Sequence, residues 1–508
     1  TDSRGIDLTG GKPYRLTNFM DKTLGKDSTG KTFIYELYKA GKKSNSVKSE
    51  LLDKANITPA GKGKPYISIA LNGDYSIKKV GIADLDGDGT YEYIIQQPNF
   101  NIDPYQKSGY WKKSPTTYKI EAYRMDGTML WRYDMGWSIE LGTWYSPWIV
   151  YDVDGDGKAE VYCKAGEGDP RDEKGLVQSG PEYLAKIDGQ TGKVIAKTEW
   201  LSRDGYKNYN YSSRNFLTVA YLDGKTPSLI MQRGTYGTIK TLAMDKDFNR
   251  IWYWSVPYGD KNVRRVGSHG LITADIDEDG RDELVLGGAV LDDNGKKLWS
   301  LNMKHPDICY AADIDPDNPG MEIFYGFESS HQTDGICLVD AKTGRKLWGH
   351  KEPTHHIHSQ GMVGDILAEF DGMEVYAGES DYPKRWLYSA KGKLIDFLTD
   401  EVLSPRPVWW DADPQKEVIT QKYTAPSGTI RDWGGQAFQQ FQGRAVAVVD
   451  CLGDHREEVI TSLEGELRIY STTIGTLERR PCLMQDHQYR MGVVAQTMGY
   501  YYPAQLGK

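Results

Sequence analysis

The sequence predicts an all-β fold, a β-propeller of eight blades, with seven blades as the alternative count. A loop motif of the form Asp-x-Asp-x-Asp-Gly, followed by a further acid, recurs along the chain between apolar, β-rich segments. A second motif, a glycine turn followed by Leu-Trp, comes after the acidic copies. The acidic copies at Asp275, Asp313 and Asp365 are separated by roughly 40 to 50 residues, which is the length of a four-stranded propeller blade.

The acidic motif marks each blade. Apolar pairs before the loop and an apolar run after it predict the order strand, acidic loop, strand. Four copies are strong and four are weaker. They begin at Asp84, Asp152, Asp275 and Asp313, and at Asp223, Asp365, Asp411 and Asp450, respectively. These eight copies give the predicted number of blades.

The second motif predicts a hairpin that closes with an aromatic strand. It occurs at 126–131, 292–299 and 342–348. Because no unit could bury its faces alone, we expect the blades to pack radially around one axis.

Residues 1–75 carry no acidic copy, and their β-rich segments predict an N-terminal cap or ring-closing segment. Residues 76–508 are predicted to form the catalytic propeller domain.

Composition and charge argue against several classes of protein. A formal net charge of −9 disfavours a nucleic-acid partner, because neutralising phosphates requires clustered Lys and Arg. No apolar run approaches the ~18 residues that a membrane span requires. The start of the chain lacks the features of a signal peptide, so we expect that any such peptide was removed or never existed. We expect a monomer that is secreted or periplasmic.

The cysteines form an odd, scattered set without a Cys-x-x-Cys motif. This pattern predicts buried thiols rather than a disulfide framework. The five residues are Cys163, Cys309, Cys337, Cys451 and Cys482.

The acidic loops are predicted to bind calcium. Aspartates at positions one, three and five and an acid at position nine place several carboxylates around one turn, and their mutual repulsion calls for a cation such as Ca²⁺. Because the site repeats, we expect most of these ions to brace blade turns rather than to take part in catalysis. The predicted ligands are Asp84, Asp86, Asp88 and Glu92; Asp152, Asp154, Asp156 and Glu160; Asp275, Asp277, Asp279 and Glu283; and Asp313, Asp315 and Asp317.

Histidine is scarce, yet three histidines, His355, His356 and His358, fall within four residues. His269, His305 and His358 precede successive acidic copies by six, eight and seven residues. Three consecutive blades should therefore present histidine at one structural level, and we expect the histidines to converge on one pocket. Two alternatives remain: each is a hydrogen-bonded loop residue, or two of them hold a transition metal.

Further candidates supply a cation and a phenol. Arg233 and Tyr236 follow a strand of the third blade, and Arg431 and Arg444 lie near the eighth acidic copy. An arginine can pair with a carboxylate, and a phenol can exchange a proton. Each of these residue types is also common in purely structural roles.

Several long segments resemble the rhamnogalacturonan lyases of polysaccharide lyase family eleven. Among them are VYDVDGDGKAEVYCKAGEG, ADIDEDGRDELVLGGAVLDDNGKKLWS and LMQDHQYRM, and the similarity runs from about Ile82 to the C-terminus. The resemblance implies an eight-bladed, calcium-binding propeller, with His269 and His305 as site histidines. The family's catalytic arginine falls on Gln360, and its catalytic lysine falls near Gln442 to Arg444, so both positions depart from the family pattern. A related group of propeller lyases removes terminal L-rhamnose from 4-linked glucuronic acid on arabinogalactan, and a divergent, exo-acting member of that group is the alternative for this chain.

The predicted activity is therefore cleavage of an acidic plant polysaccharide, between L-rhamnose and a 4-linked uronic acid, by β-elimination. Such a reaction needs a cation to neutralise the uronate carboxylate and a base near its working pKa. The candidates are His269, His305, His356 or His358 as base and acid, Arg233 or Arg444 as carboxylate partner, and Tyr236 as proton donor or sugar-binding group. The alternatives are a non-catalytic carbohydrate-binding or adhesion propeller, and a glycoside hydrolase that uses Glu328, Glu379 or Asp381.

Overall fold

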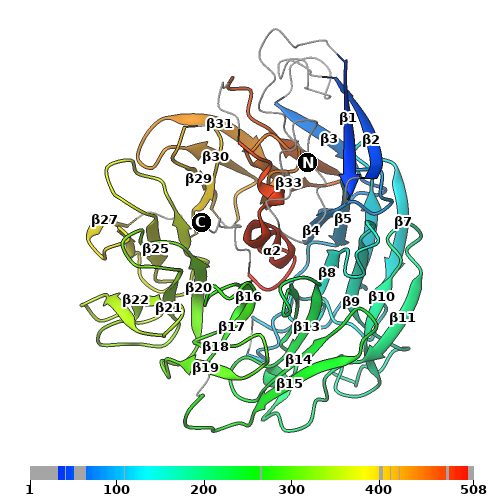
Figure 1. The fold of residues 1–508 in the computed structure, drawn as a ribbon. Helices are drawn as coiled ribbons and strands as arrows, with labels where there is room; N and C mark the ends of the chain where they lie inside the picture. The colour runs from blue at the N-terminus through cyan, green and yellow to red at the C-terminus, as the bar shows by residue number, and fades with distance from the viewer. Residues whose placement is uncertain are drawn as a thin grey trace.

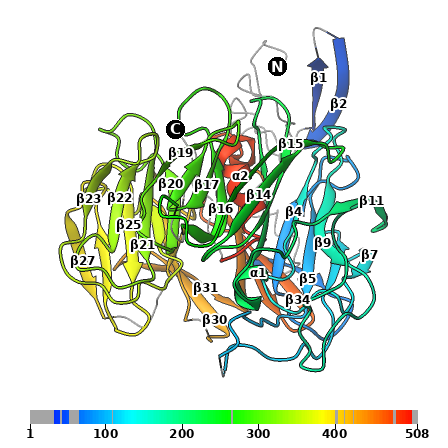
Figure 2. The ribbon, with the colours of Figure 1, turned by 90° about the horizontal axis from the view of Figure 1, so that it is seen from below.

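The computed structural model describes residues 32–39, 42–50, 65–107, 109–263, 266–399, 404–411, 413–422, 424–475 and 480–500. In these residues, eight four-stranded antiparallel sheets surround one axis and confirm the predicted eight-bladed propeller (Figure 1). A further two-stranded sheet is formed by β1 (Thr32–Lys39) and β2 (Lys42–Glu50) (Figure 2).

The first four blades follow one another in the chain, each from its inner to its outer strand. Blade 1 comprises β4 (Lys79–Ala83), β5 (Glu92–Gln97), β6 (Lys119–Tyr123) and β7 (Met129–Asp134). Blade 2 comprises β8 (Trp148–Tyr151), β9 (Glu160–Gly166), β10 (Glu182–Ile187) and β11 (Val194–Glu199). Blade 3 comprises β12 (Asn215–Ala220), β13 (Ser228–Arg233), β14 (Ile239–Met244) and β15 (Arg250–Val256). Blade 4 comprises β16 (Gly267–Ala274), β17 (Glu283–Gly287), β18 (Ala289–Leu291) and β19 (Lys297–Ser300).

The remaining blades complete the ring. Blade 5 comprises β20 (Pro306–Ala312), β21 (Glu322–Phe327), β22 (Ile336–Asp340) and β23 (Lys346–Gly349). Blade 6 comprises β24 (Met362–Gly364), β25 (Glu374–Gly378), β26 (Arg385–Tyr388) and β27 (Leu394–Leu398). Blade 7 comprises β28 (Arg406–Val408), β29 (Glu417–Thr420), β30 (Ser427–Arg431) and β31 (Ala437–Gln442). Blade 8 comprises β32 (Arg444–Val449), β33 (Glu458–Leu463), β34 (Glu466–Tyr470) and β3 (Tyr66–Ala70).

Blade 8 closes the ring by combining strands from both ends of the propeller sequence. β3 pairs with β34 in antiparallel register, with Tyr66 opposite Tyr470 and Ala70 opposite Glu466. Because the outer strand comes from the N-terminal side and the other three from the C-terminal side, opening the ring would break a complete strand ladder. Residues 66–70 therefore contribute directly to ring closure.

The predicted Leu-Trp motif joins neighbouring blades. The Trp299 indole of blade 4 donates to the Ala341 carbonyl of blade 5, with 2.8 Å between the two atoms. The ring lies against Gly344, where an added Cβ would come within 2.7 Å of Trp299. Trp131, Trp252 and Trp348 make the same kind of hydrogen bond to the next blade. The repeated motif is therefore an inter-blade contact as well as a hairpin.

Gly344→Ala should lower the free energy of unfolding by about 3 kcal/mol, because the new methyl meets Trp299 and the backbone has φ +72°. Gly320→Ala is the matched control: its φ is +90°, but no atom lies within 4 Å of the added Cβ. We expect a loss of only about 1 kcal/mol there. Denaturant unfolding of both variants measures the difference, and equal losses would contradict an inter-blade role of the Trp299 contact.

A short C-terminal helix, α2 (His487–Ala495), lies at the centre of the ring (Figure 1). Its buried side chains include Tyr489, Met491 and Val494, which pack among the inner strands. His487 at its start lies 2.9 Å from Asp282, and the Tyr500 amide beyond its end donates to the His269 carbonyl. The helix thus connects two faces of the propeller: the acidic-loop face, where inner strands end, and the histidine face, where they begin.

Two other helical segments are short, α1 (Tyr209–Ser212) and the 3-10 helix η3 (Leu483–Gln485). Among the described residues, no helix combines the length and apolarity needed to cross a membrane. All five cysteines are buried free thiols, which confirms the prediction made from their spacing.

Candidate active site

The predicted histidines meet on the histidine face. His269 lies near the start of β16, and His305 comes directly before β20. Their Nε2 atoms are 3.1 Å apart. Asp307, which is fully buried, places Oδ1 3.1 Å from His305 Nε2 and 3.4 Å from His269 Nε2. Two neighbouring blades thus bring three donor atoms to one point.

Blade 6 adds a more exposed layer to this cluster. His358 Nε2 lies 3.6 Å from Asp307 Oδ2 and 3.3 Å from the Tyr500 hydroxyl, and its side chain is 40% exposed. His356 lies 5.1 Å from His358, measured between ring centroids. One carboxylate, Asp307, therefore contacts histidines from three consecutive blades, as their spacing in the sequence predicts.

Tyr236 and a buried arginine bound the cluster on the side of blade 3. The Tyr236 hydroxyl lies 3.2 Å from His269 Nε2. The Arg214 guanidinium lies 4.9 Å from the Tyr236 ring and pairs with Asp103 at 2.8 Å. Trp144 covers His269, with ring centroids 4.5 Å apart. Aromatic rings and the Arg214–Asp103 ion pair therefore surround the histidines and limit access of water.

The environment separates the histidines electrostatically. Burial, together with the nearby His305 and Arg214, lowers the pKa of His269 well below its usual value, so this imidazole is neutral. Interaction with Glu328 raises the pKa of His356 to about 8. Burial opposes ionisation of Glu328, but the neighbouring histidines outweigh it and lower the pKa of Glu328 to about 2. His356 and Glu328, 3.5 Å apart, therefore form an ion pair at neutral pH.

In chelator-treated protein, His356 should titrate near pH 8, and Glu328→Gln should move its pKa down toward the usual value near 6.5. Because the folded-state pKa is above the unfolded value, the stabilisation from this pair is complete below about pH 6.5 and is lost as pH rises through 8. Histidine NMR titration of both proteins measures the shift. The exposed His355, whose ring lies against Tyr382, is the internal control. An unchanged His356 titration in Glu328→Gln would contradict the pairing.

The residues of the cluster fit a metal ion. The donor atoms of His269, His305 and Asp307 are 3.1–3.4 Å apart, the separation of neighbouring ligands around a cation with bonds of about 2.0–2.6 Å. His305 Nδ1 donates to the Gly267 carbonyl, which fixes the tautomer that leaves Nε2 free to bind. The donor set of two imidazoles and one carboxylate suits a divalent ion.

The acidic loops occupy the opposite face, where the inner strand meets the second strand of each blade. In blade 4, Asp275 Oδ1, Asp277 Oδ1 and Glu283 Oε1 are buried and have no hydrogen-bond partner in the described part of the chain. Glu283 uses its other oxygen to accept from the Ile276 amide. Burial raises the pKa of Glu283 to about 8, as expected for a carboxyl enclosed without a cation. The blade-4 loop therefore contains three buried carboxylate oxygens without partners, and Asp275, Asp277 and Asp279 together could hold a metal ion.

Two other loops contain a lysine ammonium among their carboxylates. In blade 2, Lys186 Nζ lies 2.8 Å from Asp154 and 3.1 Å from Glu160. In blade 5, Lys391 Nζ contacts Asp315 and lies 2.6 Å from Asp317. In blade 1 the cation is an arginine: Arg124 lies 2.9 Å from one carboxylate of the loop, that of Asp86. The loops are thus not equivalent, although their sequences are similar.

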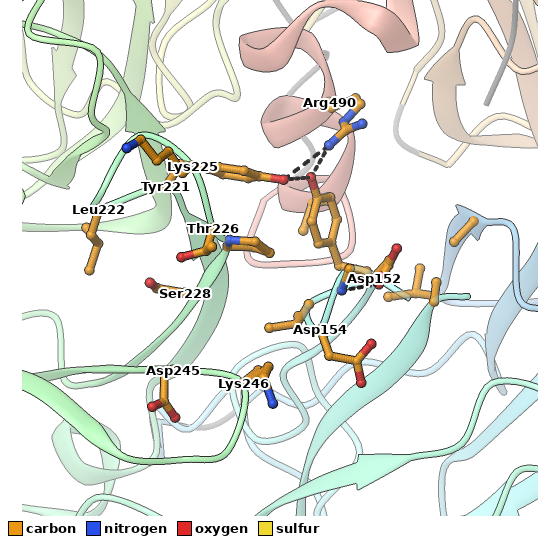
Figure 3. A pocket seen from close by; sticks show the side chains of 18 of the residues that line it. Asp152, Asp154, Tyr221, Leu222, Lys225, Thr226, Ser228, Asp245, Lys246 and Arg490 are labelled. Carbon is orange, nitrogen blue, oxygen red and sulfur yellow. Dashed lines mark hydrogen bonds between the residues drawn. The ribbon is translucent and has the colours of Figure 1, made fainter. Parts of the chain in front are cut away.

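A cavity of about 1430 Å³ lies on the acidic-loop face between blades 1 and 3 (Figure 3). Its lining contains eight aspartates but only three cationic side chains, Lys225, Lys246 and Arg490. Arg490 itself points at the hydroxyl of Tyr221 (Figure 3) and also donates to the hydroxyl of Tyr151. Such a lining repels an anionic polymer, so the histidine face is the better candidate site.

The two predicted arginines, Arg233 and Arg444, lie away from the histidine cluster. Arg233 is 1% exposed and pairs with Glu182, which also contacts Lys164 and Arg203. Its charge is thus neutralised inside blades 2 and 3. Arg444 lies on blade 8 and donates to the carbonyls of Ile77 and Lys78 at 2.8 and 2.9 Å. It is at the histidine-face end of its strand, on a different blade from those that carry the histidines.

Sequence reasoning missed Asp307, Arg214 and Trp144. Asp307 had a usable signal: it follows His305 by two residues at the start of a strand, where positions i and i+2 share one face. Arg214 directly precedes β12, as the histidines precede their own inner strands. Trp144 carried no such signal, because it lies in a loop between blades.

Together, the eight-bladed ring and its histidine–aspartate cluster define an all-β scaffold with a titratable site on one face. The family model described as the C-terminal domain of rhamnogalacturonan lyase family 11 matches residues 61–507. The chain belongs to rhamnogalacturonan lyase family 11, which confirms the resemblance seen in the sequence. It is therefore a polysaccharide lyase.

Two relatives from Bacillus subtilis (strain 168) extend this comparison. The chain is 33% identical to rhamnogalacturonan endolyase YesW, over 97% of this chain and 83% of the relative. It is 32% identical to rhamnogalacturonan exolyase YesX, over 96% of this chain and 86% of the relative. The crystal structure of YesX superimposes with a TM-score of 0.82 at 27% identity and covers 95% of this chain and 87% of that chain. One relative is an endolyase, which cleaves within the polysaccharide, and the other is an exolyase, which cleaves from an end. The similar identities to both assign neither mode of cleavage to this chain.

Proposed function

We propose that the protein cleaves rhamnogalacturonan between L-rhamnose and 4-linked galacturonic acid by β-elimination, at the histidine cluster. The observation that carries this proposal is the contact of Asp307 with His269, His305 and His358. A base, a proton donor and a candidate cation site come together there. Family membership supports a polysaccharide lyase.

His358 is the proposed base that removes the C5 proton. It is the most accessible histidine in direct contact with Asp307. That carboxylate can orient the ring and stabilise the imidazolium that forms. Tyr236 is the proposed donor to the leaving O4 oxygen, because burial raises its pKa far above neutrality and keeps the phenol protonated. The electrons of the broken C5–H bond form the C4–C5 double bond as the C4–O bond breaks.

A cation held by His269, His305 and Asp307 would supply charge neutralisation for the uronate carboxylate. On blade 8, Arg444 remains the proposed carboxylate partner, with Lys78 beside it. The Lys78 ammonium has no ion-pair partner among the described residues, and burial followed by repulsion from Arg444 lowers its pKa to about 7. Both cations lie at the histidine-face end of the inner strands.

The test is ultraviolet absorbance of the unsaturated uronate during incubation with rhamnogalacturonan and, in parallel, with gum arabic. We expect absorbance to rise with rhamnogalacturonan and not with gum arabic. A rise only with gum arabic would favour removal of terminal L-rhamnose from glucuronic acid. No rise with either polymer would favour a carbohydrate-binding propeller.

Because such polymers do not enter cells, we also propose that the protein acts in a secreted or periplasmic location.

We further propose calcium in the blade-4 loop, and lysine in place of metal in the loops of blades 2 and 5. Chelator-treated protein should take up calcium, and Asp277→Asn should lose one binding event because it removes one of the unsatisfied oxygens. Lys391→Met should gain one event, because it frees Asp315 and Asp317. Calorimetric titration counts the events. Equal stoichiometry in wild type and both variants would contradict this assignment.

A further inference from the structure

Three tyrosines form a continuous aromatic row from the histidine cluster to the surface. Tyr236 lies 4.7 Å from His305, Tyr211 lies 5.7 Å from Tyr236, and Tyr258 lies 6.2 Å from Tyr211, all measured between ring centroids. Exposure increases along the row, from the half-buried Tyr236 and Tyr211 to Tyr258, which is 44% exposed. We refer to these residues as the aromatic track.

The track is assembled from three separate segments of blade 3. Tyr211 comes from α1, before the inner strand; Tyr236 follows β13; and Tyr258 follows β15. Gly237 lies under the outer two rings, where an added Cβ would come within 2.6 Å of Tyr258 and 3.2 Å of Tyr211. A side chain at this position would force the rings to shift, so glycine permits their present spacing.

A cation lies at the outer end of the track. Lys207 is exposed, and its Nζ lies 5.4 Å from the centre of the Tyr258 ring and 3.5 Å from its hydroxyl. In the described part of the chain, the Lys207 ammonium makes no ion pair with a carboxylate. Exposed aromatic faces bind the apolar faces of sugar rings, and an ammonium pairs with a carboxylate. The combination is complementary to a polymer in which neutral and acidic sugars alternate.

We propose that Tyr211, Tyr258 and Lys207, which continue outward from Tyr236, bind further sugar residues of the polysaccharide beyond the pair that reacts, with a uronate carboxylate at Lys207. This inference rests on the proposed function, because it takes the histidine cluster as the point of cleavage. The track makes the enzyme specific for chain length: long chains contact all the rings, and short oligosaccharides contact only the inner end.

The kinetic test compares Tyr258→Ala with Tyr253→Ala on rhamnogalacturonan and on its shortest cleavable oligosaccharide. Tyr253 is the matched control, because it lies on β15 of the same blade and is 39% exposed. We expect Tyr258→Ala to raise KM for the polymer about tenfold with kcat unchanged, and to leave the oligosaccharide unaffected. Tyr253→Ala should resemble wild type on both substrates. A polymer KM that is equal in the two variants would overturn the proposal.

A binding measurement keeps this inference separate from the proposed function. Calorimetric titration of non-cleaved rhamnogalacturonan fragments into His358→Gln protein, alone and combined with Tyr258→Ala or Lys207→Gln, requires no turnover. We expect about tenfold weaker binding with Tyr258→Ala and two- to fivefold weaker, less salt-sensitive binding with Lys207→Gln. Binding that is lost with Tyr258→Ala, together with a wild-type protein that shows no lyase activity, would support the track and reject the reaction. Unchanged binding in both combined variants would reject the track.

Discussion

Asp307→Asn is expected to reduce kcat on rhamnogalacturonan about 10³-fold. The substitution removes the one carboxylate that contacts His269, His305 and His358. An amide cannot neutralise an imidazolium formed at His358, and it is a weaker ligand for a cation at the other two histidines. The steady-state rate of double-bond formation measures the effect.

The control for this variant is Asp282→Asn on the opposite face. Asp282 is also buried and contacts a histidine, His487, at 2.9 Å, but it lies far from the proposed chemistry. Both variants should lose a similar amount of stability, about 1–3 kcal/mol, because each disturbs a buried, hydrogen-bonded carboxylate. Only Asp307→Asn should lose activity. Equal losses of activity in the two variants would mean that Asp307 stabilises the fold and has no separate role in catalysis.

His358→Gln is expected to reduce kcat about 10²- to 10⁴-fold, the usual contribution of a general base. The side chain is 40% exposed, so the substitution should hardly change the unfolding temperature. His355→Gln is the matched control: it lies in the same histidine-rich segment but stacks on Tyr382, with ring centroids 4.9 Å apart. His355→Gln should remain active. A His358→Gln enzyme with normal kcat would transfer the role of base to another group.

The repeat predicted the fold because its information is local. Each acidic loop and each Leu-Trp hairpin lies within one blade, so counting the copies gave eight blades before any contact was known. The same regularity placed His269, His305 and His358 at equivalent positions ahead of their inner strands. Equivalent positions in a ring face a common axis, which is why these histidines meet.

What the sequence left open depends on contacts between distant segments. The partner of Arg233 is Glu182 in the neighbouring blade, and no local pattern reveals that its charge is already neutralised. Lys186 and Lys391 reach acidic loops from strands or turns far along the chain, so loops with nearly identical sequences differ in their need for a cation. The aromatic track was also invisible, because its three tyrosines come from three different connections.

The central claim is that the histidine face cleaves by elimination and not by hydrolysis. The most direct measurement is mass spectrometry of rhamnogalacturonan digested in water labelled with heavy oxygen. Elimination predicts that every new non-reducing end is an unsaturated uronate, and that no label is incorporated during cleavage. Saturated new ends, with one labelled oxygen added per bond broken, would contradict the account and indicate a hydrolase.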